Sequence, residues 1–277
     1  MSTDPPAPPA SSEWGRFGVS DVIELHAGKQ SRVFAAQVDG VDVAIKLTDR
    51  RLVDRALLEV RMAVVESIAV DLAEVVCPRR LDRELVQRIG GWLMTATPIV
   101  TGERLDLSRP ETGELMGQTL ARLHRSMASL TSRYIPAVAA LGTTAADVDR
   151  STWQLLHGDF NDQNLISTPT GLRVFDFDDC GYGPTEFDVA NSLYMVLFDA
   201  EVHDRAELYD NFRPSFLTGY AVGSGKQLDS EIIDELITVR ISALASWLDD
   251  LPSAPIGIRT SSPEWQDTLR SFVRSHT

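Results

Sequence analysis

The chain has little cysteine, little lysine and no long hydrophobic run. Its two cysteines, Cys77 and Cys180, lie far apart and belong to no CxxC or His-rich pattern, which excludes a disulfide framework and a zinc site. No stretch approaches 18 uncharged apolar residues, which excludes a membrane-spanning helix. We therefore expect a cytoplasmic protein whose cysteines are small, buried or half-buried side chains.

Negative charge dominates, with 40 acidic against 26 basic residues and a net charge of -14. Residues 1–97 contain 12 basic and 14 acidic residues, and the remainder contains 14 basic and 26 acidic ones. An acidic surface repels nucleic acid and anionic membranes and attracts cations. We expect neither of those partners. We expect a cationic ligand for the acidic part, unless the charge serves solubility alone.

The pattern along the 277 residues allows one large domain or two modest lobes. Residues 1–16 are rich in Pro, Ser and Ala and lack the features of a signal peptide, which predicts a disordered tail. Residues 17–97 predict strands with one helix, 54–70, inserted. Beyond them, helical spacing predicts helices at 114–129, 185–198, 205–220 and 230–248.

Asp39-Gly40 predicts a two-residue hairpin, and the strand after it alternates apolar and polar residues. This alternation places Lys46 on the face opposite the apolar row. On the helix that follows, Glu59 and Glu66 share one flank. Further on, the spacing of Thr185 and Asp188 predicts a capping box at a helix start, which gives Asp188 a structural role.

The chemically informative segment runs from Leu155 to Asp179 and includes His157-Gly158-Asp159, Asn164 and Asp176. Pro169-Thr170-Gly171 predicts a three-residue turn between strands at 165–168 and 172–175. A hairpin that is symmetric about Thr170 would set Leu165 opposite Phe175 and Asn164 opposite Asp176. Directly opposite side chains start about 5 Å apart.

An amide oxygen and a carboxylate at such spacing are hard ligands that suit a hydrated Mg²⁺ bound to substrate phosphates. Asp159, five residues before Asn164, could stand beside this metal without ligating it. Phosphoryl transfer needs an in-line hydroxyl, a carboxylate to orient it and take its proton, and cations on the phosphates. The segment therefore predicts a kinase.

His157-Gly158-Asp159, Asn164 and Asp176 together resemble the aminoglycoside phosphotransferase and choline kinase group, whose catalytic loop reads HGDxxxxN. The resemblance extends from about Val22 to Phe198. It implies an α+β, two-lobed fold similar to protein kinases. The small β-rich N-lobe with one main helix, residues 17–97, would bind nucleotide, and the larger, mainly helical C-lobe, residues 98–277, would hold the catalytic and acceptor sites.

By this resemblance Asp159 is the catalytic base, Asn164 and Asp176 bind magnesium, and the cofactors are ATP (or GTP) and Mg²⁺. Lys46, in Val-Ala-Ile-Lys, matches the lysine that holds the α- and β-phosphates. Only three lysines occur against 23 arginines, so a lysine at this position is less likely to be accidental. His157 is expected to brace the loop.

The remaining expected contacts depend on the same resemblance. Glu59 would pair with Lys46, with Glu66 as the alternative, and the loop 27–31 would cover the phosphates through Gly28 and Ser31, although it departs from GxGxxG. The hinge that binds adenine would be Thr95, Ala96 and Thr97. Asp162, Asp178 and Asp179 are candidate substrate residues, and the last two could instead bind a second metal or be solvated.

The acceptor is predicted to be a small cationic molecule with a hydroxyl. The leading hypothesis is an antibiotic resistance kinase for an aminoglycoside or for a basic cyclic peptide of the viomycin and capreomycin type. The alternative is a metabolic kinase for homoserine, choline or a sugar. A non-catalytic nucleotide-binding regulator is a third hypothesis, which the presence of Lys46, Asp159, Asn164 and Asp176 argues against.

Overall fold

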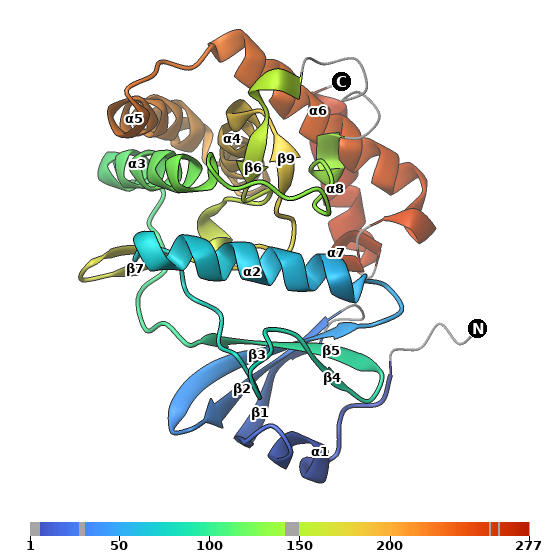
Figure 1. Ribbon diagram of the computed structural model, residues 1–277. Helices are drawn as coiled ribbons and strands as arrows, with labels where there is room; N and C mark the ends of the chain where they lie inside the picture. Colours follow the sequence, from blue (N-terminus) through green and yellow to red (C-terminus); the bar gives the residue numbers. More distant parts are fainter. Residues whose placement is uncertain (1–5, 28–30, 142–149, 255, 260, 277) are drawn as a thin grey trace. The chain divides into compact units, whose positions relative to one another are not determined.

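The computed structural model describes residues 6–27, 31–141, 150–254, 256–259 and 261–276 (Figure 1). The chain divides into two compact units, one of Met1–Val70 with Val75–Thr101 and one of Asp71–Glu74 with Gly102–Thr277. The first unit is built on a sheet and the second mainly on helices. The predicted α+β class is confirmed.

The sheet of the first unit is antiparallel, with strand order β1-β2-β3-β5-β4. Its strands are β1 (Val19–Ala27), β2 (Ser31–Val38), β3 (Val41–Asp49), β4 (Gln87–Ile89) and β5 (Trp92–Pro98). Asp39 and Gly40 connect β2 to β3 with φ of 50° and 75°, as a two-residue hairpin turn requires. The hairpin prediction is confirmed.

A short helix precedes the sheet where the sequence predicted a disordered tail. This helix, α1 (Ser11–Gly15), buries Trp14, whose ring meets Phe34 edge-on at 5.4 Å between centroids. The tail prediction is therefore wrong for these residues, because one large aromatic side chain anchors them to the sheet. The longer helix of this unit, α2 (Arg55–Asp71), lies where the helix at 54–70 was predicted.

The second unit is mainly helical and contains two short strand pairs, β6–β9 among the helices and the β7–β8 hairpin at the edge (Figure 1). Its elements are α3 (Pro110–Met127), η2 (Arg150–Thr152), β6 (Gln154–Leu156), η3 (Asp162–Asn164), β7 (Leu165–Thr168), β8 (Gly171–Val174), β9 (Gly181–Gly183), α4 (Thr185–Val202), α5 (Ala206–Ser224), α6 (Ser230–Asp249), η4 (Leu251–Ser253), α7 (Ile256–Arg259) and α8 (Pro263–Ser275). The helices predicted in this part match α3 to α6, and α8 was not predicted. In the described ranges we find no helix with the length and hydropathy needed to cross a bilayer.

Helices α3 and α5 lie side by side at the distance that glycine permits. A Cβ at Gly117 of α3 would overlap the carbonyl oxygen of Phe216, and a Cβ at Gly219 of α5 would overlap that of Glu114. Small residues at such an interface let two backbones approach closely. The approach brings His124 of α3 within hydrogen-bond reach of Tyr220 of α5.

Candidate active site

The loop after β6 carries the HGD sequence in a conformation that requires glycine. Gly158 has a φ of 85°, and a Cβ there would overlap the carbonyl oxygen of Asp179. Any other residue would meet both the left-handed strain and this overlap. The glycine therefore lets the chain before Asp159 run against the segment that follows Asp176.

Three side-chain amides fix the Asp159 carboxylate. Oδ1 accepts from Asn161 Nδ2 at 2.9 Å and from Asn191 Nδ2 at 3.3 Å, and Oδ2 accepts from Asn164 Nδ2 at 3.0 Å. Burial raises the pKa of Asp159, and the charge of Arg240 is among the effects that oppose this rise. The result is an oriented carboxylate in a partly dry setting, which suits a proton acceptor.

The His157 side chain is fully buried and braces the loop, as expected. Its Nε2 lies 3.1 Å from the carbonyl oxygen of Phe175, and its Nδ1 lies 3.3 Å from the amide nitrogen of Asp159. These partners assign the proton to Nε2 and leave Nδ1 as an acceptor. The ring thus joins the loop that carries Asp159 to the strand that leads to Asp176.

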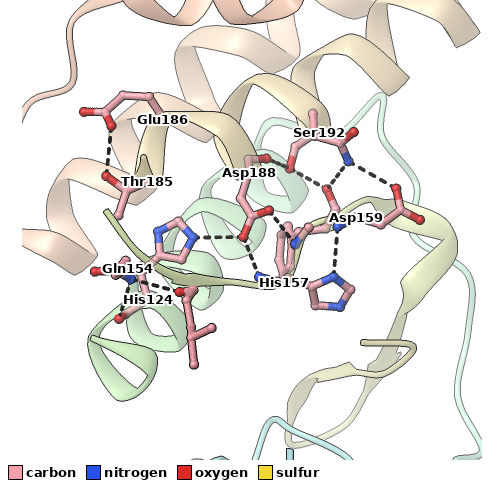
Figure 2. Close-up of polar contacts among 12 residues, drawn as sticks. His124, Gln154, His157, Asp159, Thr185, Glu186, Asp188 and Ser192 are labelled. Carbon is pink, nitrogen blue, oxygen red and sulfur yellow. Dashed lines mark hydrogen bonds and ion pairs between the residues drawn. The ribbon is translucent and has the colours of Figure 1, made fainter. Parts of the chain in front are cut away.

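Asp188 of α4 anchors the same loop through backbone amides (Figure 2). Its carboxylate is fully buried and accepts from the amides of His157 and Gly158, each at 2.9 Å. The structural role predicted for Asp188 is correct, but the capping box is wrong: Pro184 is the N-cap residue, and no side chain caps this helix. The loop amides, left without a strand partner, take the carboxylate instead.

His124 supports Asp188, and Tyr220 supports His124 in turn. His124 Nε2 lies 3.1 Å from Asp188 Oδ2, and His124 Nδ1 lies 2.9 Å from the Tyr220 hydroxyl (Figure 2 shows the His124–Asp188 contact). Burial raises the pKa of Tyr220 to about 12, which keeps this hydroxyl protonated. Helices α3, α4 and α5 thereby converge on the loop that holds Asp159.

The predicted hairpin forms, with a register one residue away from the expected one. Leu165 pairs with Val174 and Thr168 with Gly171, because Gly171 adopts a φ of 116° and joins the strand. The turn is thereby shortened to Pro169-Thr170. The Phe175 amide donates to the carbonyl oxygen of Asn164 at 3.2 Å, so Asp176 follows the residue opposite Asn164 and does not face it.

Asn164 and Asp176 still offer the oxygen donors that a divalent metal needs. Asn164 Nδ2 donates to both the carbonyl oxygen and Oδ2 of Asp159, at 2.8 and 3.0 Å, which turns its Oδ1 away from that carboxylate. Asp176 is exposed and has a φ of 61°, a strained conformation of the kind that occurs at functional sites. The donor chemistry fits Mg²⁺. The described ranges contain no cluster of three His, Cys, Asp or Glu side chains suited to a metal, so this pair would be the protein's contribution.

In the first unit, Lys46 occupies β3 as predicted. Val43, Ile45 and Leu47 are fully buried on one face, and Lys46 lies between them on the other, opposite Thr95 of β5. Its phosphate-binding role stays a prediction. Ser31 opens β2, and Gly28 lies outside the described residues.

The two candidate glutamates of α2 both have arginine partners. Glu59 pairs with Arg55 Nε at 2.6 Å. Glu66 receives two bonds from Arg80, at 2.7 and 2.6 Å, which lower the pKa of Glu66. Because the Arg80 pair is bidentate, Glu59 remains the better candidate partner for Lys46.

The predicted hinge lies inside a strand. Thr95, Ala96 and Thr97 pair with β3, and the Ala96 carbonyl accepts from the Arg79 amide at 2.8 Å. Backbone groups that bond to a neighbouring strand are not free for adenine, so a hinge here would have to use the remaining ones. The adenine-binding role of Thr95, Ala96 and Thr97 stays a prediction.

Among the candidate substrate residues, Asp162 has a raised pKa. Burial raises the pKa of Asp162, and the nearby Asp199 charge adds to the rise. Asp178 is half-buried and Asp179 exposed, and the choice among their possible roles stays open.

Sequence reasoning missed several supporting residues, namely Asn161 in the loop before η3 and, on helices, His124, Asn191, Ser192, Tyr220 and Arg240. One signal was available: α4 buries Asp188, Asn191 and Ser192 within an otherwise apolar run. Buried polar groups need partners, and such a run with three of them indicates a polar site at that helix face.

Residues 129–230 match the model of the phosphotransferase enzyme family. A search of curated proteins finds no match. Among solved structures, the chain is similar to amicoumacin kinase hAmiN, solved in complex with AMP-PNP, Ca²⁺ and Ami, with 18% identity and a TM-score of 0.77 over 94% of this chain and 90% of that one.

Two further structures share the fold. A microcompartment-associated aminopropanol kinase has 17% identity and a TM-score of 0.66, covering 92% of this chain and 89% of that one. Spectinomycin phosphotransferase APH(9)-Ia, solved with ADP and spectinomycin, has 13% identity and a TM-score of 0.62, covering 91% and 89%. The resemblance predicted from the sequence is therefore confirmed: residues 129–230 have the sequence pattern of the phosphotransferase enzyme family, on the kinase-like fold of antibiotic and amino-alcohol kinases.

Proposed function

We propose that the protein is an ATP- and magnesium-dependent O-phosphotransferase that transfers the γ-phosphoryl group to a hydroxyl of a small cationic molecule. One observation carries this proposal: Asp159 is oriented by the amides of Asn161, Asn164 and Asn191 on a loop anchored by Asp188. Such an arrangement holds a carboxylate ready for an incoming hydroxyl. We assign nucleotide binding to residues 17–97 and the catalytic and acceptor sites to residues 98–277.

Asp159 would hydrogen-bond the acceptor hydroxyl, orient its lone pair toward the γ-phosphorus and accept its proton as the new P–O bond forms. The bond between the γ-phosphorus and the β,γ-bridging oxygen would break in the same step, and ADP would leave with that oxygen. Oδ1 already accepts two hydrogen bonds, from Asn191 and Asn161, and Oδ2 accepts only one, from Asn164. Oδ2 is therefore the oxygen with more room for the acceptor hydroxyl. A positioned base of this kind contributes about 10²- to 10⁴-fold to the rate.

Asn164 and Asp176 would hold the divalent ion, and Lys46 would bind the nucleotide phosphates. The ion, when bound, neutralises charge on the β- and γ-phosphates. Hydrogen bonds from the side-chain amide of Asn164 to Asp159 connect the proposed base to a proposed metal ligand. A nucleotide analogue with Ca²⁺ in the amicoumacin kinase structure and ADP in the spectinomycin phosphotransferase structure support nucleotide and metal use.

For the acceptor we place an antibiotic first, of the aminoglycoside or the viomycin and capreomycin class. The excess of negative charge after residue 97 favours a cation. Two of the structures with this fold are antibiotic-modifying kinases. The consequence of phosphorylation would be resistance.

The second candidate is a metabolic kinase for an amino alcohol, a hydroxy amino acid such as homoserine, or a sugar. The fold shared with an aminopropanol kinase favours it. Here phosphorylation would serve catabolism or biosynthesis, and resistance would be unchanged.

The test is to incubate the purified protein with ATP, Mg²⁺ and a mixture of aminoglycosides, capreomycin, viomycin, aminopropanol, choline and homoserine, and to detect phosphorylated products by mass spectrometry. We expect one acceptor class to gain a phosphoryl group. No phosphorylated product from any member, with ATP still intact, would contradict the proposed function.

A further inference from the structure

Arg240 lies midway along α6, next to the elements that hold Asp159. Asn191 of α4 donates to Asp159 Oδ1, and Tyr194 follows three residues later on the same helix face. The guanidinium of Arg240 lies over the Tyr194 ring, 5.2 Å from its centroid. Arg240 therefore contacts the helix that also supplies Asn191 to the Asp159 carboxylate, and its charge acts on Asp159.

Two aromatic rings hold the Arg240 side chain. Its guanidinium lies 5.2 Å from the Tyr194 centroid and 5.9 Å from the Trp247 centroid. Contacts of this kind attract a cation and fix the plane of the guanidinium. Tyr194 belongs to α4 and Trp247 to α6, so both rings are held by regular helices.

The donors of Arg240 are unused within the described part of the chain. Nε is buried without a hydrogen-bond partner, and the described carboxylates include none within ion-pair distance of this arginine. A guanidinium carries five N–H donors in a planar fork that matches a carboxylate. The buried, unpaired Nε–H is costly unless an acceptor from a ligand or from water completes it.

Several other arginines of this unit pair with carboxylates. Arg122 pairs with Glu74 at 2.7 Å, Arg213 with Asp234 at 2.7 Å and Arg270 with Asp267 at 3.4 Å. Others, such as Arg125 and Arg133, have no carboxylate partner but are exposed, whereas Arg240 is half-buried and its Nε is buried without a hydrogen-bond partner, which requires an explanation. The two rings hold Arg240 beside the catalytic base, where a carboxylate of the substrate can be the missing partner.

We propose that Arg240 is an acceptor-binding residue that receives a carboxylate of the acceptor, while Asp159 receives its hydroxyl. This inference rests on the proposed function and, within it, favours the hydroxy amino acids of the second candidate over the polycationic antibiotics placed first. Molecules that carry an amine, a hydroxyl and a carboxylate, as hydroxy amino acids do, satisfy Asp159, the acidic surroundings and Arg240 together. A purely polycationic acceptor would leave Arg240 unpaired and repel it.

The first experiment observes Arg240 directly and does not need turnover. In protein labelled with ¹⁵N-arginine, the Nε–H signal of Arg240 is assigned by its loss in Arg240→Lys, with Arg270→Gln as the control arginine. We expect 4-hydroxybutyrate to shift this signal, and the matched diol 1,4-butanediol to leave it in place. No shift with 4-hydroxybutyrate, or an equal shift with the diol, would overturn the proposal.

A third arm separates the carboxylate from the phosphoryl product. O-phosphoethanolamine has a phosphoryl group and no carboxylate. A shift produced by this compound alone would assign Arg240 to the transferred phosphoryl group and overturn the carboxylate assignment.

The second experiment uses catalysis. Homoserine is compared with 3-amino-1-propanol, which lacks only the carboxylate, in the wild type and in Arg240→Lys and Arg240→Gln. We expect the wild type to prefer homoserine in kcat/KM by about 10- to 100-fold, the range for a lost charged hydrogen bond, and the Gln variant to lose that preference. An unchanged preference in the Gln variant would contradict the role of Arg240. Absence of phosphorylation in every sample would count against the proposed function, and the labelled-arginine titration would still decide the role of Arg240.

Discussion

The two units position their functional residues by different physical means. In the first, Lys46 lies on a regular strand between fully buried Ile45 and Leu47, so alternation alone sets its face. In the second, Asp159 depends on side chains from α4, and Asp188 beneath it depends on His124 and, through it, Tyr220. A residue placed by alternation can be replaced with little change in the free energy of unfolding. Replacing a member of a buried hydrogen-bond network lowers that free energy.

The largest effect should follow from Asp188→Ala. The change removes the acceptor for two buried loop amides and for His124, each costing about 1–3 kcal/mol when unsatisfied. We expect a loss of at least about 3 kcal/mol in the free energy of unfolding, measured by urea denaturation, together with loss of activity. The control is Asp199→Ala, which removes a partly exposed pair with Arg205 and should cost less than about 1 kcal/mol. An equal loss of unfolding free energy in the two variants would show that the buried network contributes no more to stability than an exposed ion pair.

Next in size is Gly117→Ala in the interface of α3 and α5. The added methyl group would overlap the Phe216 carbonyl, and overpacking of this kind costs about 1–3 kcal/mol. Gly15→Ala, with nothing near its Cβ in the first unit, should be close to neutral. Thermal unfolding of both variants measures the difference, and a neutral Gly117→Ala would show that the helices can separate without cost.

Lys46→Met should separate function from stability in the first unit. Loss of one charged contact to phosphate should lower kcat/KM for ATP by about 10- to 100-fold. The free energy of unfolding should change by less than about 1 kcal/mol, because Lys46 is outside the apolar row. Arg88→Met, on the exposed face of β4, is the matched control. A stability loss as large as that of Asp188→Ala would refute the separation.

The smallest effect concerns the pH dependence of the network. Burial raises the pKa of Tyr220 to about 12, above the unperturbed value of about 10. Between these values the unfolded chain releases the tyrosine proton and the folded chain keeps it, so stability falls as pH rises, by at most about 1.4 kcal/mol per pH unit. Tyr220→Phe should show a shallower fall between pH 10 and 12 in urea denaturation. Identical slopes would show that Tyr220 titrates normally.

The sequence was sufficient for the features that depend on local pattern. Alternation set the face of Lys46, Asp39-Gly40 specified its turn, and the spacing of Asp159 and Asn164 marked the catalytic loop. The register of the β7–β8 hairpin was missed by one residue, because Gly171 can extend a strand at a φ that other residues avoid. The local pattern is compatible with a three-residue turn that includes Gly171 and with a two-residue turn that leaves Gly171 in the strand.

The residues that were missed meet only through tertiary packing. His124 and Asp188 are 64 positions apart and touch because α3 and α4 pack together. Arg240 is identified by its clamp of Tyr194 and Trp247 and by the lack of a carboxylate partner in the described chain. Burial of α1 by Trp14 is likewise a property of the folded sheet. Propensity and spacing contain no information on such contacts.

The most direct test of the catalytic assignment is the rate of phosphoryl transfer in Asp159→Asn, compared with Asp267→Asn on the exposed face of α8. Single-turnover measurements with saturating ATP and an accepted hydroxyl substrate should give a rate about 10²- to 10⁴-fold below the wild type for Asp159→Asn, with ATP binding retained and Asp267→Asn unchanged. A wild-type rate in Asp159→Asn would contradict the assignment of Asp159 as the base.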